Sequence, residues 1–159
     1  MEINFSTIEL KTPANSVITG IITSPNYPGE YPHNLDKTHT IEVESGKILR
    51  IQFIHFAVLG KPAACQNYDY VKITDGDGTT LMNKSCGYSL FPPSSSFYFP
   101  LPNITSRSNR VEILFHTDGY NQESMINATG WSLSWSAVTP GLKALIQTVR
   151  NFNPCSSSD

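Results

Sequence analysis

The stretch Gly130-Trp131-Ser132-Leu133-Ser134-Trp135-Ser136 alternates large apolar and small hydroxyl side chains without a break. Successive side chains of a β-strand point to opposite faces of a sheet, so this period of two predicts a strand with one buried face and one wet face. A period of two recurs in Leu49–Phe53, where Arg50 and Gln52 separate the apolar residues, and in Val111–Phe115, where Glu112 and Leu114 do. Further strands are expected at Val17–Thr23, Thr40–Val43, Tyr68–Ile73 and Ser96–Phe99.

Turn-forming residues separate these runs. Asn26-Tyr27-Pro28-Gly29, Ser45-Gly46, Asp75-Gly76-Asp77-Gly78, Ser106–Asn109 and Asp118-Gly119 all lie between expected strands. Glycine, proline, asparagine and aspartate favour turns because they tolerate or fix the backbone angles that turns need. Many short strands with no helical pattern between them predict an all-β fold, an antiparallel, jelly-roll-like β-sandwich.

Length and composition predict one domain with tails. At 159 residues and 39% hydrophobic content, the chain can bury one core. We expect an N-terminal extension over residues 1–16, the domain over 17–138, and a linker and polar tail over 139–159. Within that last segment, apolar residues at helical spacing predict a short amphipathic helix between Gly141 and Phe152. They are Leu142, Leu145, Ile146 and Val149.

Charge and hydropathy exclude two classes of partner. Only 15% of the residues are charged and the formal net charge is −2, so no basic footprint for nucleic acid is present. No apolar run approaches the ~20 residues of a membrane span. Met1-Glu2-Ile3-Asn4 does not resemble a signal peptide. We interpret Met1 as a processed or artificial start and not as a sign of the cytosol.

The sequence contains no signature of catalysis. Its four histidines, His33, His39, His55 and His116, lack the His-Glu-x-x-His or His-x-His spacing of a zinc enzyme. The Gly-x-Ser-x-Gly motif of serine hydrolases is also absent. His116 and Asp118 would share a face of a strand, but a structural role at a turn is the favoured interpretation. We therefore expect no enzymatic activity from this chain.

Four Asn-x-Ser/Thr sequons, the acceptor motif for N-linked glycans, occur in the chain. They begin at Asn4, Asn83, Asn103 and Asn127. About two would arise by chance in a sequence this rich in serine and threonine. Asn127, which lies just before an expected turn, is the favoured acceptor.

The cysteine count is odd. Cys65 and Cys86 lie in loop-like sequence on either side of the expected Tyr68–Ile73 strand, and Cys155 lies in the polar tail. Three reduced thiols would fit a cytosolic protein. A Cys65–Cys86 disulfide is the favoured alternative, and its closed loop would contribute about 3 kcal/mol in the chain-entropy account. Cys155 would then be a free thiol or half of a bond to another domain or chain.

Several short motifs follow one another in a fixed order. They are Ser24-Pro25-Asn26-Tyr27-Pro28, Tyr31-Pro32, Tyr68-Asp69-Tyr70-Val71, Asp75-Gly76, Cys86-Gly87, Thr105-Ser106 and Gly130-Trp131. In this order the region from about Ile18 to Ala137 resembles the CUB domain, an extracellular β-sandwich that serves as a recognition module. The resemblance implies the Cys65–Cys86 pairing. The family's other disulfide is missing, because Lys37 stands where a cysteine is usual. The first CUB domains of some complement proteases have the same single-disulfide pattern.

The resemblance also suggests a calcium site. In calcium-binding CUB domains a glutamate, two aspartates and an asparagine supply oxygen atoms, and a tyrosine braces the glutamate. Asp69, Asp118, Asn121 and Tyr31 match this pattern, but Leu59 stands at the position of the glutamate. With two carboxylates, the affinity is expected in the weak extracellular class of about 10⁻⁴–10⁻³ M, or weaker. In calcium-binding CUB domains, an acidic residue at this site binds a lysine or arginine side chain of the ligand.

An aromatic loop is a second candidate for binding. Phe91 lies in Tyr88-Ser89-Leu90-Phe91-Pro92-Pro93, and it is either an exposed anchor for a partner or folded back under its loop. Aromatic side chains often anchor protein interfaces.

Three functions are compatible with these observations. The first is a non-catalytic, extracellular protein-binding module of a larger secreted or cell-surface protein. The second is a stand-alone, lectin-like adhesive protein that binds glycans, and the third is the accessory domain of an extracellular protease. The ligand and the oligomeric state do not follow from the sequence, because function lies in loops that the fold does not dictate.

Overall fold

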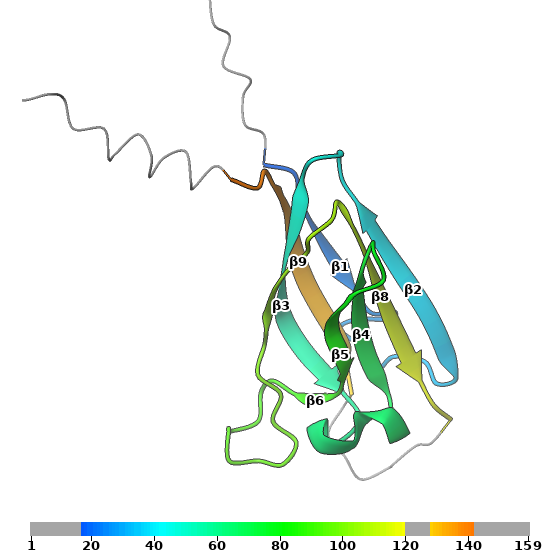
Figure 1. Cartoon of the computed structure of the whole chain (residues 1–159). Helices are drawn as coiled ribbons and strands as arrows, with labels where there is room; N and C mark the ends of the chain where they lie inside the picture. The colour runs from blue at the N-terminus through cyan, green and yellow to red at the C-terminus, as the bar shows by residue number, and fades with distance from the viewer. Residues whose placement is uncertain (1–16, 120–127, 142–159) are drawn as a thin grey trace, which may run out of the picture.

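The computed structural model of the chain describes residues 17–119 and 128–141, which form a β-sandwich (Figure 1). Sheet A contains β1 (Thr19–Thr23), β9 (Gly130–Val138), β3 (Ile48–Val58) and β6 (Gly87–Tyr88) in that order, and β7 (Asn103–Thr105) also pairs with β3. Sheet B contains β2 (Leu35–Glu42), β8 (Arg110–Thr117), β4 (Tyr70–Asp75) and β5 (Thr80–Ser85).

All paired strands run antiparallel. The only helix among the described residues is a short 3₁₀ helix, η1 (Pro62–Asn67), which lies between β3 and β4. The predicted all-β antiparallel sandwich is therefore confirmed. No helix of this part of the chain is long and apolar enough to cross a bilayer.

The core lies between the two sheets and follows the predicted alternation. Trp131 and Leu133 of β9, Phe53 of β3 and Phe115 of β8 are fully buried or nearly so. The Trp131 ring meets the Phe115 and Phe53 rings edge-on, with centroids 6.0 and 6.3 Å apart. Aromatic pairs in this geometry stabilise a core beyond the area that they bury.

One of the serines expected in water is instead buried. Ser132 is 5% exposed, although it lies on the outer face of β9. Its neighbour in the sheet is His55, whose ring packs against Tyr27 with centroids 5.6 Å apart. The two rings lie on the same side of the sheet as Ser132, which accounts for its burial.

Two of the sequence motifs contact each other. Ser24 Oγ accepts a hydrogen bond from the Trp131 N–H, and the Ser24 N–H donates to the Trp131 carbonyl, both at 2.9 Å. Gly130 has a φ of 81°, and a Cβ there would lie 1.9 Å from Ser24 Oγ. The glycine of Gly130-Trp131 is thus required by both its backbone angle and the close approach of Ser24.

Of the predicted strand at Ser96–Phe99, only one isolated parallel bridge forms, between Tyr98 and Tyr88. The Tyr88 N–H donates to the Phe97 carbonyl at 2.8 Å, and the Phe99 N–H donates to the Tyr88 carbonyl at 3.1 Å. Turns precede this bridge, since the Ser95 N–H donates to the Pro92 carbonyl and the Tyr98 N–H to the Ser95 carbonyl. The strand of this region is β7, and its three residues are too few to show an alternation of buried and exposed side chains.

Two strand boundaries also differ from expectation. β2 begins at Leu35 and not at Thr40, because it is an edge strand whose only buried side chain is Ile41. β4 begins at Tyr70, since η1 occupies the chain as far as Asn67. The predicted helix between Gly141 and Phe152 and the N-terminal extension lie outside the described residues.

A buried aspartate joins two turns at one end of the sandwich. Asp75 is 2% exposed and accepts hydrogen bonds from the N–H groups of Arg107 (2.7 Å), Gly76 (2.8 Å) and Ser108 (3.2 Å). The Ser108 hydroxyl also donates to it. Burial acts to raise the pKa of Asp75, but these hydrogen bonds outweigh it and hold the pKa below its usual value.

We predict that Asp75→Ala lowers the free energy of unfolding by about 3 kcal/mol, because several buried donors lose their acceptor. The depressed pKa adds a pH dependence. The stabilisation from the carboxylate is complete above the unfolded-state pKa of about 3.9 and is lost as the pH falls through the lower folded-state pKa. Urea unfolding of wild type and Asp75→Asn from pH 7 downward measures this, and a stability difference that stays constant with pH would contradict it.

Candidate functional site

The candidate site lies at the opposite end of the sandwich from Asp75, where the β1–β2 connection, the end of β3, the start of β4 and the end of β8 meet. Figure 1 shows this end beside η1. The Tyr31 hydroxyl donates to Asp69 Oδ2 at 2.6 Å and accepts from the Leu59 N–H at 2.9 Å. The Asp118 N–H donates to Asp69 Oδ1 at 2.7 Å. Three of the predicted site residues, Tyr31, Asp69 and Asp118, are therefore brought together.

Tyr31 is fixed by the core. It is 4% exposed, and its ring meets Phe115 edge-on with centroids 5.0 Å apart. Burial, followed by the charge of Asp69, raises the pKa of Tyr31 far above its usual value. The hydroxyl therefore stays protonated and remains the donor to Asp69.

Asp69 is a buried carboxylate. It is 1% exposed, so a ligand at the surface cannot reach it without rearrangement. Burial raises the pKa of Asp69, the hydrogen bonds from Tyr31 and from the Asp118 N–H act against this rise, and the charge of Asp118 adds to it. Asp118 itself is half-buried, so it is the carboxylate of the pair that a ligand can meet. Asp69 thus positions Asp118 through the backbone of residue 118.

Sequence reasoning missed Thr117. Its side chain is buried; its hydroxyl donates to the Pro32 carbonyl at 2.8 Å and accepts from the Leu35 N–H at 2.9 Å. The Asn34 N–H also donates to the Asp118 carbonyl at 3.0 Å. These bonds fasten the β1–β2 connection to the end of β8. A lone threonine at a strand end carries no sequence signal for such a role.

The predicted disulfide is confirmed. Cys65 of η1 and Cys86 are bonded, with Cα atoms 5.5 Å apart. Gly60 has a φ of 143°, and a Cβ there would lie 2.7 Å from Cys86 Sγ. The disulfide therefore packs directly against the chain that follows Leu59. Cys155 lies outside the described residues.

The described residues do not complete a calcium site. Calcium takes six to eight oxygen ligands, and its affinity follows the number of carboxylates. Asp69 and Asp118 supply two, and the Leu59 side chain has no oxygen to add. The described part of the chain contains no cluster of three or more histidine, cysteine, aspartate or glutamate residues that could hold a metal. Asn121, the fourth predicted ligand, lies outside the described residues.

The aromatic loop lines a hollow of about 330 Å³, whose walls are mostly apolar and aromatic. Phe91 is half-buried and packs on Tyr88, with ring centroids 5.0 Å apart. Its neighbour Leu90 is 81% exposed, so Leu90 and not Phe91 projects from this loop. Sequence reasoning chose the aromatic residue because aromatic side chains are the commoner anchors at interfaces.

Two of the four sequon asparagines are described, and neither belongs to this hydrogen-bonded group. Asn83 and Asn103 are exposed, on β5 and β7 respectively. Asn4 and Asn127 lie outside the described residues. His116 contacts Asp36 at 2.7 Å on the outer face of sheet B. His55 Nε2 lies 2.8 Å from Thr129 Oγ1, but no carboxylate among the described residues contacts this histidine.

Comparison with known proteins identifies the family. The CUB domain family profile matches residues 14–135. Rat cubilin is 32% identical over 139 residues, which cover 87% of this chain and 3% of cubilin. The solved CUB1-EGF-CUB2 domains of human MASP-1/3 share 28% identity at a TM-score of 0.62 and cover 76% of this chain and 42% of that one. The chain therefore belongs to the CUB domain family.

A calcium-bound relative is also similar. The crystal structure of the MASP-1 CUB2 domain bound to Ca²⁺ is 30% identical at a TM-score of 0.54, covering 74% of this chain and 90% of that one. Calcium binding thus occurs within the family. The present chain spans only a small part of cubilin, so the activity of that whole protein does not transfer to it.

We predict that Tyr31→Phe lowers the free energy of unfolding by about 2 kcal/mol, because a buried carboxylate and the Leu59 N–H each lose a partner. Asp69 also predicts a pH dependence. Since its folded-state pKa is raised, the folded state binds a proton more readily than the unfolded state, so wild type gains stability relative to Asp69→Asn as the pH falls through the folded-state pKa.

The measurement is urea unfolding of wild type, Tyr31→Phe and Asp69→Asn between pH 7 and pH 4. Loss of the Tyr31 hydrogen bond raises the pKa of Asp69 further, so Tyr31→Phe should show the steeper gain on acidification. A wild type that loses stability relative to Asp69→Asn over this range would contradict the assignment.

Proposed function

We propose that this chain is a non-catalytic, extracellular protein-binding module whose recognition surface is the end formed by Tyr31, Asp69 and Asp118. The observation that carries the proposal is the buried Asp69 carboxylate, which holds the backbone of the surface residue Asp118 at 2.7 Å. Membership of the CUB family supports it. The Cys65–Cys86 disulfide supports an extracellular location, because disulfides persist in oxidising compartments.

The chemistry of this end favours a basic ligand side chain. Asp118 presents a carboxylate at the surface, and the neutral hydroxyl of Tyr31 adds no opposing charge. Lysine and arginine make charge-assisted hydrogen bonds with carboxylates, which are about twice as strong as neutral ones. Leu90, projecting from the aromatic loop, offers an apolar contact at the 330 Å³ hollow. The ligand is therefore expected to present both a lysine or arginine and an apolar residue.

The module works without a resident calcium ion in this proposal. In a calcium-binding end the ion joins the loops, whereas here the bonds of Asp69 to Tyr31 and to the Asp118 N–H join the same segments directly. The relatives carry the domain within much longer chains, which supports a role as one module of a larger protein.

We predict that Asp118→Ala weakens ligand binding about tenfold or more, since a charge-assisted hydrogen bond contributes about 1.5–3 kcal/mol. The matched control is Glu44→Ala, an exposed acidic residue in the β2–β3 turn at the opposite end. The probe is a panel of secreted and cell-surface ectodomains, screened with wild type and both variants by surface plasmon resonance. Equal losses for the two variants would contradict the assignment of the recognition surface.

We also predict that Leu59→Glu creates calcium-dependent stability that wild type lacks, because it adds a third carboxylate next to Tyr31. Calcium at 100 times its Kd would raise the free energy of unfolding by about 2.7 kcal/mol. Thermal unfolding in 10 mM calcium and in chelator tests this, with Leu59→Gln as the uncharged control. A calcium shift in wild type that Asp118→Ala abolishes would show instead that the two native carboxylates suffice.

A further inference from the structure

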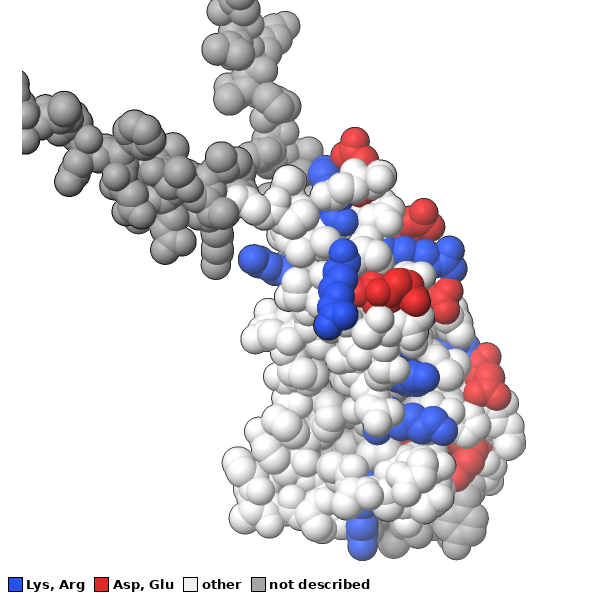
Figure 2. All heavy atoms as spheres, viewed as in Figure 1, with Lys and Arg blue, Asp and Glu red and all other residues white. Residues whose placement is uncertain are grey.

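The two sheets differ in the charge of their strands. Arg50 is the only lysine, arginine, aspartate or glutamate in the strands of sheet A. The strands of sheet B carry Asp36, Lys37, Glu42, Lys72, Asp75, Lys84, Arg110 and Glu112. Figure 2 shows charged side chains gathered on the side where sheet B lies, with much of the rest uncharged.

Exposed apolar residues gather on the uncharged side. Every large apolar side chain that is exposed among the described residues lies on sheet A or in a segment next to its strands. They are Val17, Ile18, Ile21, Ile54, Leu90 and Leu101. Val17, Ile18 and Ile21 are close together in the chain, and contiguous exposed apolar surface commonly marks a surface that something covers.

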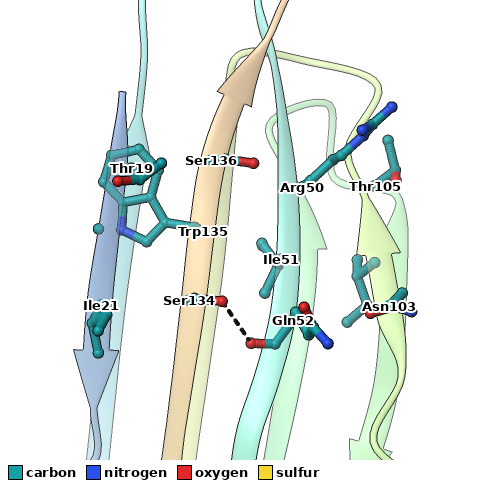
Figure 3. A pocket seen from close by; sticks show the side chains of 12 residues that line it. Thr19, Ile21, Arg50, Ile51, Gln52, Asn103, Thr105, Ser134, Trp135 and Ser136 are labelled. Atoms are coloured by element: carbon teal, nitrogen blue, oxygen red, sulfur yellow. Dashed lines mark hydrogen bonds between the residues drawn. The ribbon is translucent and has the colours of Figure 1, made fainter. Parts of the chain in front are cut away.

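A hollow of about 480 Å³ lies on sheet A (Figure 3). The register aligns Ile21 of β1, Ser134 of β9, Gln52 of β3 and Asn103 of β7 in one row across four strands. The next row is Thr19, Ser136, Arg50 and Thr105. Short serines on the central strand β9 lie between longer side chains on its neighbours, which makes the surface concave along β9.

Asn103 is both part of this hollow and the acceptor of a sequon. Asn103 and Thr105 of Asn103-Ile104-Thr105 lie on the same face of β7, since residues two apart in a strand share a face, and both are exposed. The Asn103 amide makes no side-chain hydrogen bond to another residue in the described ranges. In the other described sequon, Asn83 Oδ1 accepts a hydrogen bond from the Lys84 N–H at 2.9 Å, and it lies on β5 of the charged sheet B.

We propose that Asn103 carries an N-linked glycan and that this glycan lies along the hollow toward Ile21, covering the two rows of side chains that line it. The proposal rests on the extracellular location proposed above. The transfer forms a bond between Asn103 Nδ2 and the anomeric carbon of a lipid-diphosphate-linked oligosaccharide. The bond from that carbon to the phosphate oxygen breaks, the lipid diphosphate leaves with the electron pair, and Nδ2 loses one proton to solvent.

The chemistry of the hollow suits a sugar chain. A pyranose ring presents hydroxyl groups at its rim and C–H groups on its faces. The hollow offers hydroxyls and amides as partners, the exposed Ile21 as an apolar contact, and one guanidinium, that of Arg50. Ser134 Oγ donates only a long hydrogen bond, 3.5 Å, to the Gln52 carbonyl, and a sugar hydroxyl at a shorter distance could replace it (Figure 3).

The length of the row also fits the first few sugars of a glycan. Asn103 and Ile21 are separated by three strand spacings, about 14 Å. Because the glycan is attached at one end of the hollow, its contacts are intramolecular and do not have to offset the loss of translational freedom that a separate ligand pays. A second copy of the chain, packed face to face, is the competing occupant and is an outcome of the test.

The experiment compares wild type, Asn103→Gln and Asn83→Gln, each secreted from a eukaryotic host that makes high-mannose glycans. Glycopeptide mass mapping should show glycan on Asn103 in wild type and in Asn83→Gln. In isotope-labelled protein, nuclear Overhauser contacts should join the Ile21 methyl groups to sugar protons. These contacts should vanish in Asn103→Gln and after an endoglycosidase trims each glycan to its first sugar.

Three results would overturn the proposal. The first is an unmodified Asn103, and the second is a glycan on Asn103 without contacts to Ile21. The third is a glycosylated wild type that dimerises through this face. Asn103→Gln should bind the ectodomain panel like wild type, because the recognition surface is elsewhere. If the glycan or its contacts to Ile21 are absent while binding to the ectodomain panel is intact, this inference is refuted and the proposed function stands.

Discussion

The buried carboxylate of Asp69 is the constraint on which the functional end of this domain depends. Removing a carboxylate from water is unfavourable unless hydrogen bonds compensate for the lost hydration. Tyr31 and the backbone of Asp118 provide that compensation, and Tyr31 in turn contacts both Leu59 and the core residue Phe115. Leu59 is thus joined, through Tyr31, to the three segments that meet at this one carboxylate, those of Tyr31, Asp69 and Asp118. Their positions follow from the need to satisfy it.

The central strands could be predicted from the sequence because their side chains alternate between core and solvent. β3, β8 and β9 show this alternation clearly, and the buried sets Leu49–Ile51–Phe53 and Val111–Ile113–Phe115 are those expected. For the edge strand β2 the predicted range is too short, because most of its residues are exposed and show no alternation between core and solvent. The three-residue β7 was missed because its length is below what periodicity can detect.

The main residues of the site could be predicted from the sequence, but their arrangement could not. Tyr31, Asp69 and Asp118 were found through the motifs that contain them. Their arrangement depends on the backbone N–H groups of Leu59 and Asp118. Nearly every residue type has such a group, so the sequence does not show which ones are used. The exposure of Leu90 could not be predicted from the sequence. It depends on the packing of Phe91 against Tyr88, which turns Phe91 inward and leaves Leu90 in solvent.

The fastening of the β1–β2 connection to the end of β8 has a thermodynamic consequence. Thr117 and Asp69 hold these segments before any ligand arrives, and the Cys65–Cys86 bond restrains the chain beside them. Ordering loops on binding costs conformational entropy, and a surface that is already ordered has little of it to lose. A small recognition surface of this kind therefore loses less of the free energy of its few contacts to the ordering of its own loops, and more of it remains as affinity.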